Sequence, residues 1–220
     1  MAQDLIDEGK VLVDGRKVLK TSTKVSCGSQ IEIESYPRYV SRGGLKLEKA
    51  LETFKVNVKD LIVADVGSSH GGFTDCLLQH GAKRVYAIDV GKNQLDAKLR
   101  QNPRVQIYEE TDIRELKNLP ELTDLAVVDV SFISLTQVLP SVQRLLKREG
   151  EIIALIKPQF EIGPKGLDKR GVVRDKILLQ KAIEKIKSWA RDNGWKVQGL
   201  IESPIKGAEG NIEYLIYLAR

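Results

Sequence analysis

The feature that most constrains the fold of this chain is the segment from Asp65 to Phe73, which reads Asp-Val-Gly-Ser-Ser-His-Gly-Gly-Phe. An apolar run, Leu61 to Ala64, precedes it, and a helix-compatible run, Phe73 to His80, follows. The pattern predicts a strand, a glycine turn and a helix N-terminus. Glycine admits a close ligand, and the helix start offers unpaired N–H groups. Such junctions bind nucleotide-like cofactors at the carboxyl edge of a parallel sheet, although a tight turn without a ligand is the simpler alternative.

A second strand-like run, Arg84 to Asp89, narrows the choice of ligand. It ends in an acid 24 positions after Asp65, where a carboxylate can accept bonds from both hydroxyls of a ribose. The glycine turn has neither the G-x-G-x-x-G spacing nor the G-x-x-x-x-G-K-S/T spacing, which disfavours NAD and ATP. The pattern D-x-G-x-x-x-G-G-F resembles the first motif of S-adenosylmethionine-dependent methyltransferases.

Composition sets broad limits. The 220 residues, 30% charged and 42% hydrophobic, fit a soluble globular protein with one ordinary domain and a small one. The net charge of +5 favours an anionic partner, but only weakly. Cys27 and Cys76 have no spacing for a metal site or a disulfide framework, so we expect no metal and a cytoplasmic location.

The N-terminal residues contain no recognisable signal peptide, because Asp4, Asp7 and Glu8 interrupt any apolar region. The longest apolar candidate, Leu125 to Leu139, contains Asp129 and falls short of the ~18 residues that a membrane helix needs. We therefore expect no membrane partner.

Most of the chain alternates between strand-like and helix-like runs. Strands are expected near residues 61–66, 84–89, 105–108, 124–130, 151–156, 196–202 and 212–218, and helices near 41–53, 73–80, 92–100, 134–148 and 174–193. Such alternation predicts an α/β fold with a mainly parallel seven-stranded sheet and helices on both faces. The short loop 203–211 suggests that the last two strands form an antiparallel pair at one edge.

Residues 1–36 have a different character. Residues 3–8 resemble the end of a helix, residues 11–18 a hairpin around an Asp-Gly turn, and residues 30–34 a half-buried strand. This indicates a small α+β domain over residues 1–36, a linker at 37–40, and the main domain over 41–220.

Charged residues stand where strands of the main domain are expected to end. Asp129 and Lys157 follow apolar runs, and Glu213 lies near the start of a last strand that runs the opposite way. An antiparallel strand begins at the edge where its parallel neighbours finish, so the three side chains are expected to meet over the cofactor cleft. Lys46, on the helix before the first strand, could join them. A lone Lys or Glu at a strand end is more often simply solvated.

Two lysines and two carboxylates in one small volume suit methylation of a hydroxyl, which needs a base. A lysine amine starts at a pKa of about 10.4, and desolvation and a second cation lower that value. We expect Lys157 to be the base and Lys46 the orienting cation, with Asp129 and Glu213 positioning the amines. The protein would mainly align the acceptor oxygen with the electrophilic methyl group.

Five segments in order carry a resemblance to a known family. They are residues 41–47 (Ser-Arg-Gly-Gly-Leu-Lys-Leu), 65–73, 129–135 (Asp-Val-Ser-Phe-Ile-Ser-Leu), 157–161 (Lys-Pro-Gln-Phe-Glu) and 210–214 (Gly-Asn-Ile-Glu-Tyr). Over nearly its whole length the chain resembles the TlyA (hemolysin A) family of ribosomal RNA 2′-O-methyltransferases, within the FtsJ-like group. The resemblance implies a Rossmann-like class I methyltransferase that uses S-adenosyl-L-methionine and acts on ribosomal RNA or ribosomal subunits.

The resemblance also implies site residues. The family's Lys-Asp-Lys-Glu tetrad falls on Lys46, Asp129, Lys157 and Glu213. The implied cofactor-binding residues are Asp65, Gly67, Ser68, Gly71, Gly72, Phe73, Asp89 and Asp112. Asp112 follows the third strand, where it could meet adenine, or could simply be a loop acid or a helix cap.

The front segment resembles the small RNA-binding domain of ribosomal protein S-four, but here it begins inside that domain's second helix, which suggests a truncated start. The expected RNA-binding residues are Lys10, Arg16, Lys17 and Arg42, with Lys165, Lys169 and Arg170 on the glycine-rich loop 160–171. Phe132, Phe160 and Tyr214 could stack on a flipped base, although such aromatics are more often core residues.

The sequence disfavours three alternative functions. A base-nitrogen methyltransferase often carries Asn/Asp-Pro-Pro-aromatic after the fourth strand, whereas this chain has Asp-Val-Ser-Phe at residues 129–132. An RNA-binding ribosome-assembly factor with weak or no transferase activity would not need the tetrad. A pore former would need an apolar or strongly amphipathic segment that the chain lacks.

Overall fold

Apolar runs form the inner strands of the larger sheet in the computed structural model, which describes residues 5–6 and 9–220. Its strands, within the described residues, are β4 (Ile62–Val66), β5 (Arg84–Ile88), β6 (Val105–Tyr108), β7 (Thr123–Val128), β8 (Leu146–Ile156), β9 (Lys196–Glu202) and β10 (Tyr214–Ala219). Their order is β6-β5-β4-β7-β8-β10-β9. β10 pairs antiparallel with both β8 and β9, whereas the other strand pairs of this sheet are parallel. The predicted seven-stranded α/β sheet is confirmed.

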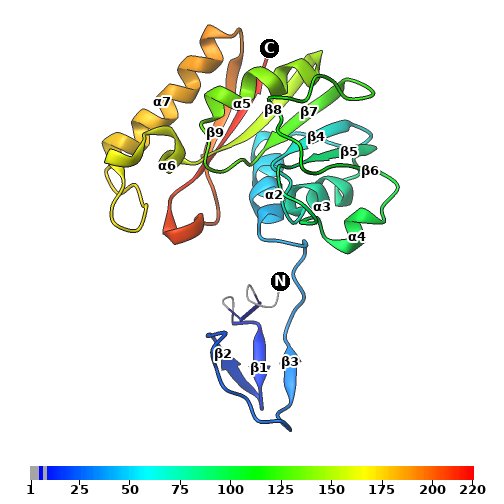
Figure 1. Ribbon diagram of the computed structural model, residues 1–220, viewed down its shortest axis with the longest axis vertical. Helices are drawn as coiled ribbons and strands as arrows, with labels where there is room; N and C mark the ends of the chain where they lie inside the picture. Colours follow the sequence, from blue (N-terminus) through cyan, green and yellow to red (C-terminus); the bar gives the residue numbers. More distant parts are fainter. Residues whose placement is uncertain (1–4, 7–8) are drawn as a thin grey trace.

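Helices cover both faces of this sheet, as Figure 1 shows. The helical elements are α2 (Gly43–Phe54), α3 (Gly72–Gln79), α4 (Ala97–Arg100), α5 (Leu135–Val142), α6 (Pro158–Glu161), α7 (Lys176–Asp192) and the 3₁₀ turns η1 (Gln143–Leu145), η2 (Pro164–Gly166) and η3 (Ala208–Gly210). Apolar residues of α2, α3 and α4 pack in one core cluster, and those of α5 and α7 pack in another. Alternate residues of β7 divide between the two clusters, because successive strand side chains point to opposite faces.

The first residues of two helices are fixed by side-chain caps. The Ser134 side chain accepts a hydrogen bond from the Thr136 N–H at the start of α5. The Asp175 carboxylate accepts one from the Ile177 N–H at the start of α7, at 2.8 Å. Each cap satisfies a backbone donor that has no partner inside its helix.

The front of the chain forms a separate three-stranded antiparallel sheet in the order β2-β1-β3. β1 (Val11–Val13) and β2 (Arg16–Val18) form the predicted hairpin around Asp14 and Gly15, both with positive φ. β3 (Ile31–Ile33) is exposed along its length, so the expectation of a half-buried strand is wrong. Its extensive contacts with described elements are with β1 alone, and this in-sheet pairing does not cover its side chains. The helix end expected at residues 3–8 lies largely outside the described residues.

An extended segment connects the small sheet to α2 (Figure 1). Within the expected linker 37–40, Tyr39 is buried in the core cluster of α2 and α3. The Val40 N–H donates to the Asp75 carboxylate on α3, at 2.9 Å. Residues 39 and 40 are therefore fixed to the larger domain, although the exact domain boundaries stay a prediction.

The helix expected over residues 92–100 is much shorter than predicted. Only α4 (Ala97–Arg100) is helical. The Glu109 carboxylate accepts hydrogen bonds from the N–H groups of Asn93, Gln94 and Leu95, which holds residues 93–95 as a loop. Arg100 is the main reason that the pKa of Glu109 is lowered to about 2, so this acceptor stays ionised. Tertiary contacts thus override local helix propensity.

The helix expected over residues 134–148 also ends early. α5 stops at Val142 and η1 at Leu145, and β8 begins at Leu146. Leu146 pairs with Thr123 of β7, and the Thr123 hydroxyl donates to the Leu145 carbonyl at 3.1 Å. Residues 146–148 therefore belong to the sheet, although their apolar periodicity alone predicted a helix.

Leu125 tests the contribution of the central strand to stability. Its side chain is fully buried in β7, whereas Leu122, just before β7, is 51% exposed. Leu125→Ala should lower the free energy of unfolding by about 2–5 kcal/mol, because it removes buried contacts and leaves a cavity. Leu122→Ala should change it by no more than about 0.5 kcal/mol. Urea denaturation of both variants measures this, and equal effects would contradict the assigned burial.

Candidate active site

The glycine turn after β4 brings two loops into contact. Gly67 has a φ of +85°, and a Cβ atom there would collide with the backbone carbonyl of Asp129. Gly72 begins α3, and a Cβ atom there would collide with the hydroxyl of Ser41 and with the backbone nitrogen of Gly44 in α2. Glycine is needed at both positions because backbone approaches this close leave no room for a side chain. The turn therefore lies directly against the loop that follows β7.

The remaining residues expected in the cofactor turn differ in their surroundings. Gly71 has a φ of +93° and packs against Leu95 and Leu99, so it shapes the turn without lining a cavity described here. Ser68 is buried, and its N–H donates to the Ile88 carbonyl at 3.2 Å. Ser68 and the largely buried Phe73 both line a cavity of about 340 Å³ beside the starts of α2 and α3.

Asp65 lies beneath this turn rather than on a cavity wall. It is fully buried, and one of its oxygens accepts a hydrogen bond from the Thr74 hydroxyl at 2.6 Å. The other oxygen has no hydrogen-bond partner among the described residues. Burial is the main reason that the pKa of Asp65 is raised to about 7, and the nearby Asp129 and Asp89 carboxylates raise it further. Asp65 thus holds a proton more tightly than an exposed aspartate.

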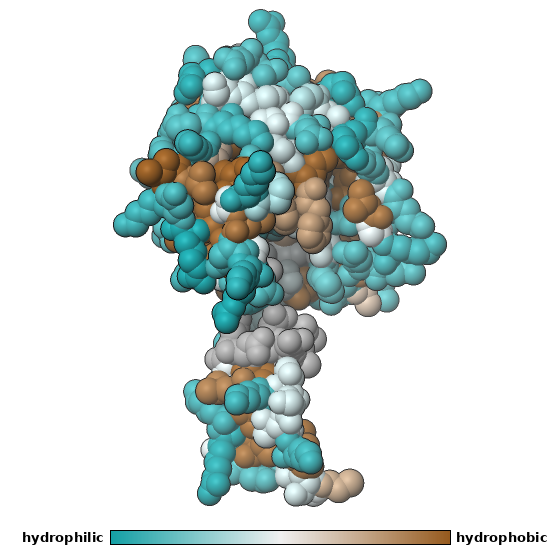
Figure 2. Space-filling view, turned by 60° about the vertical axis from the view of Figure 1, so that its left-hand side comes forward, coloured by the Kyte–Doolittle hydropathy of each residue, from teal (hydrophilic) through white to brown (hydrophobic). Residues whose placement is uncertain are grey.

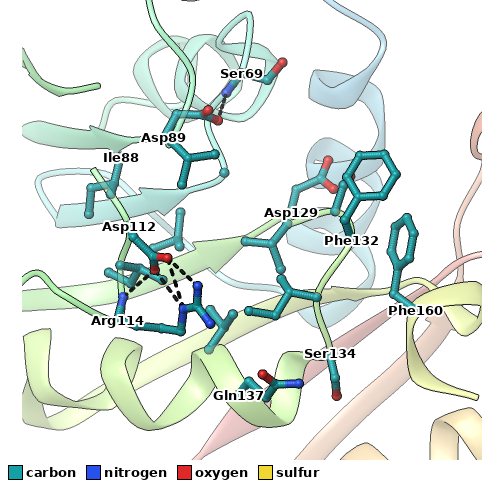
Figure 3. Close-up of a pocket in the computed structure, with 18 of the residues that line it drawn as sticks. Ser69, Ile88, Asp89, Asp112, Arg114, Asp129, Phe132, Ser134, Gln137 and Phe160 are labelled. Carbon is teal, nitrogen blue, oxygen red and sulfur yellow. Dashed lines mark hydrogen bonds and ion pairs between the residues drawn. The ribbon is translucent and has the colours of Figure 1, made fainter. Parts of the chain in front are cut away.

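Asp89 and Asp112 line a larger cavity of about 850 Å³, shown in Figure 3. The Asp89 carboxylate accepts hydrogen bonds from the N–H groups of Ser69 and Gly91, at 2.8 and 2.7 Å. Asp112 forms an ion pair with Arg114, which holds the pKa of Asp112 below its usual range. A carboxylate has about four acceptor positions, so Asp89 retains capacity for ribose hydroxyls.

These observations fit a cofactor of the S-adenosylmethionine class. The glycine turn gives close backbone access, and the Asp89 carboxylate faces the cavity at the end of the second parallel strand. Apolar Ile88, Ile113 and Val130 line the same cavity and could contact a flat base. The groups needed for a sugar and a base thus meet at one edge of the sheet.

The four residues of the expected tetrad are brought together as two ion pairs. The Lys46 amine lies 2.6 Å from a Glu213 oxygen, and the Lys157 amine lies 2.6 Å from an Asp129 oxygen. The Lys157 amine also donates to the Ser131 hydroxyl at 2.8 Å. The Glu213 side chain is only 2% exposed, so its pairing with Lys46 offsets the cost of burying a charge.

Three cavities meet at this cluster, because Asp129 lines the 850 Å³ cavity and, together with Lys46, the 340 Å³ cavity. Lys46, Lys157 and Glu213 line a cavity of about 560 Å³, named here the acceptor cavity. Phe132 and Phe160 line both it and the 850 Å³ cavity, and their ring centroids are 5.1 Å apart. Figure 3 shows the two rings side by side at one end of the larger cavity. Phe132 is 90% exposed, which is unusual for so apolar a side chain and leaves its ring available for a ligand.

The basic residues expected to bind RNA lie on two parts of the surface. Arg16 and Lys17 are exposed on β2, where Lys17 forms an ion pair with Glu34 at 3.0 Å, and Lys10 precedes β1. Arg42 is exposed at the start of α2.

The other three, Lys165, Lys169 and Arg170, are exposed on the loop whose residues 163, 164, 167 and 171 line the acceptor cavity. Figure 2 shows hydrophilic side chains bordering apolar surface on one face of the larger domain. The loop places positive charge next to the expected acceptor.

Sequence reasoning missed two polar residues that organise the acceptor cavity. Ser131 contacts Lys157 as described, and it stands two positions after Asp129 in the same motif. The buried Asn211 side chain accepts from the Val173 N–H at 3.0 Å and donates to the Gly171 carbonyl at 3.1 Å. Asn211 thus joins the two loops that form the cavity. Its position two residues before Glu213 was the available signal.

Comparison with known proteins identifies the family. The model of the FtsJ-like methyltransferases matches residues 39–220. This chain belongs to that family. The S4-domain model matches residues 1–31, so the predicted pairing of the two domains is confirmed.

Curated relatives share most of their length with the chain. It is 44% identical to Hemolysin A of Brachyspira hyodysenteriae, over 98% of this chain and 91% of the relative. It is 41% identical to the 16S/23S rRNA (cytidine-2′-O)-methyltransferase TlyA of Mycobacterium tuberculosis, over 99% and 82%. The resemblance to the TlyA (hemolysin A) group is therefore confirmed.

Solved structures support the same fold. A Streptococcus thermophilus protein described as a candidate hemolysin is 43% identical, with a TM-score of 0.85 over 100% of this chain and 82% of its own. An S-adenosylmethionine-dependent methyltransferase of Mesorhizobium loti, only 15% identical, has a TM-score of 0.61 over 81% and 99%, which shows the shared fold alone. Among the described residues, no helix has the length and apolar character to cross a bilayer, and no three metal-binding side chains cluster.

The raised pKa of Asp65 predicts a pH-dependent stability. Folded Asp65 keeps its proton until about pH 7, whereas an unfolded aspartate loses it near pH 4, so ionisation of Asp65 opposes folding. The free energy of unfolding, measured relative to Asp65→Asn, should therefore fall between about pH 4 and pH 7, with a slope of up to about 1.4 kcal/mol per pH unit.

Urea denaturation across this pH range measures the difference. Glu149→Gln, at an exposed side chain, controls for the change in net charge. Parallel stability profiles for the native protein and Asp65→Asn would contradict the assigned protonation.

Proposed function

We propose that this protein transfers a methyl group from S-adenosyl-L-methionine to a ribose 2′-hydroxyl of ribosomal RNA. The observation that carries the proposal is the juxtaposition of the two lysine–carboxylate pairs with the glycine turn of a methyltransferase fold. The M. tuberculosis relative and the 40% identical TlyA of Campylobacter jejuni are both named rRNA cytidine-2′-O-methyltransferases, which supports this acceptor.

The proposed cofactor site extends from the glycine turn to Asp112. Gly67 gives the backbone access, Asp89 accepts from the ribose hydroxyls, and Asp112 lies where adenine would end. The bound sulfonium would supply an electrophilic methyl group, whose transfer leaves a neutral thioether. Gly67 also touches the Asp129 backbone, so the cofactor turn and the tetrad are held in a fixed relation.

Lys157 is the proposed base. Its amine must be neutral when it takes the proton of the 2′-hydroxyl, so that the oxygen can form its new bond to carbon. Asp129 and Ser131 orient the Lys157 amine at 2.6 and 2.8 Å. Lys46, held by Glu213, supplies a positive charge near the acceptor oxygen. A fixed geometry of this kind lowers the barrier by aligning the reacting atoms.

RNA contacts are proposed on both domains. The match to the S4 domain supports RNA binding by the front segment, with Lys10, Arg16 and Lys17 near phosphates. Arg42 and the loop residues Lys165, Lys169 and Arg170 would hold the backbone around the acceptor cavity. Phe132 and Phe160 offer stacking surface for the target nucleotide, whereas Tyr214 is the half-buried first residue of β10 and packs against the core.

Labelled methyl transfer to purified small and large ribosomal subunits, tested separately, examines the function directly. Nuclease digestion and mass spectrometry should place the added methyl mass on a ribose. Methyl mass on a base would overturn the proposal. Cofactor binding without transfer to either subunit would instead favour a ribosome-assembly factor.

Lys157→Ala should reduce transfer by at least about 100-fold, because the acceptor hydroxyl loses its base. The dissociation constant of S-adenosylmethionine should change little, since Lys157 lines the acceptor cavity and not the 850 Å³ cavity. Single-turnover transfer and calorimetry measure the two effects. Lys196→Ala, at an exposed position of β9, is the matched control. Survival of activity at neutral pH would remove Lys157 as the base.

Asp89→Ala should weaken cofactor affinity by about tenfold or more, because bonds to a charged acceptor are lost and the turn loses its contacts to Ser69 and Gly91. Calorimetric titration measures the dissociation constant, and circular dichroism checks the fold. Asp192→Ala, at the exposed end of α7, should bind the cofactor normally. An unchanged dissociation constant for Asp89→Ala would exclude the ribose contact.

A further inference from the structure

Gln159 carries a side-chain amide oxygen that has no hydrogen-bond partner among the described residues, although the atom is buried. Buried polar groups are nearly always paired, so such an exception needs an explanation. Gln159 follows the proposed base by two positions, on the short helix α6, and it lines the acceptor cavity.

The other non-exposed polar side chains of the acceptor cavity already have partners among the described residues. Lys46 pairs with Glu213, and Lys157 binds Asp129 and Ser131. Asn211 uses both ends of its amide to join the flanking loops. Gln159 is therefore the amide on this wall that is left to bind a ligand.

The position of the cavity defines what that ligand would be. A ribose whose 2′-oxygen lies at Lys157 places its base in the remaining volume of the acceptor cavity. Phe132, Phe160, Pro164 and Leu167 supply apolar surface for the faces of the base. A base stacked on these residues can present its edge to the wall that carries Gln159. Rotation about the terminal torsion of the glutamine side chain turns the oxygen toward that edge.

We propose that Gln159 is a specificity-determining residue that accepts a hydrogen bond from the exocyclic amino group of the target base. The inference rests on the proposed function and deepens it. A glutamine amide offers an acceptor beside a donor, which complements the amino group and ring nitrogen on the Watson–Crick edge of cytosine. The same principle lets glutamine read an amino group and ring nitrogen of adenine in the DNA major groove.

Uridine fits this position less well. In the orientation that pairs with cytosine, the amide places its oxygen opposite a carbonyl oxygen of uridine and its NH2 group opposite the uridine ring N–H, so both contacts are unfavourable. The exocyclic amino group of cytosine projects beyond the ring and reaches a recessed acceptor directly. A cytidine target also agrees with the names of the M. tuberculosis and C. jejuni relatives.

The test compares two variants on two substrates. The methylated nucleotide is first mapped on the subunit that accepts the label. Subunits are then prepared with that position as cytidine or as uridine, and kcat/KM is measured for the native protein, Gln159→Leu and Gln159→Ala. Gln198→Leu, at an exposed position of β9, is the matched control. Melting temperatures and cofactor dissociation constants verify that each variant is folded.

The native protein and the Gln198→Leu control should prefer cytidine by at least about 20-fold, since a site built to hydrogen-bond an amino group rejects a base without it. Both Gln159 variants should lose activity on cytidine and reduce this preference to about threefold or less, with unchanged cofactor affinity.

Variants that keep the native preference overturn the inference and leave the methyltransferase proposal intact. A mapped target without an amino group also overturns it. Failure of the native protein to methylate either subunit overturns the proposed function, and this inference with it.

Discussion

The close approach of Gly67 to the backbone carbonyl of Asp129 is the contact on which the site depends. It joins the loop after β4, which forms the proposed cofactor turn, to the loop after β7, which carries a member of the proposed tetrad. Any side chain at position 67 would separate the two loops. Because β4 and β7 are hydrogen-bonded neighbours in a parallel sheet, both loops emerge at the same edge, and the sheet fixes their spacing.

Two lysine–carboxylate ion pairs form the other side of the candidate site. Each lysine of the tetrad is held by a carboxylate from a different element: Lys46 on α2 by Glu213 before β10, and Lys157 after β8 by Asp129 after β7. The antiparallel direction of β10 is what brings Glu213 to this edge, since a parallel strand would begin at the opposite edge. The amines are therefore positioned by the sheet topology as well as by their partners, as the proposed proton transfer requires.

The acceptor cavity is built differently, from loops. Asn211 joins the loop before α7 to the loop before β10, and the Phe132–Phe160 pair lines both this cavity and the larger one. Loops suit this role because they can vary in sequence while the sheet holds the reacting groups. The unpartnered amide of Gln159 on this wall connects the proposed chemistry with the choice of nucleotide.

The sequence by itself determined the α/β sheet, its antiparallel last strand and the glycine turn, and it predicted that Lys46, Asp129, Lys157 and Glu213 lie together, because apolar periodicity and ordered motifs report on local structure and strand ends. Tertiary structure alone decided where the helices at residues 92–100 and 134–148 end, since Glu109 and the pairing of Leu146 with Thr123 compete with helix formation. It also decided which lysine pairs with which carboxylate, the raised pKa of Asp65, and the unpaired side-chain oxygen of Gln159. These properties depend on distances between residues far apart in the chain, which local patterns do not encode.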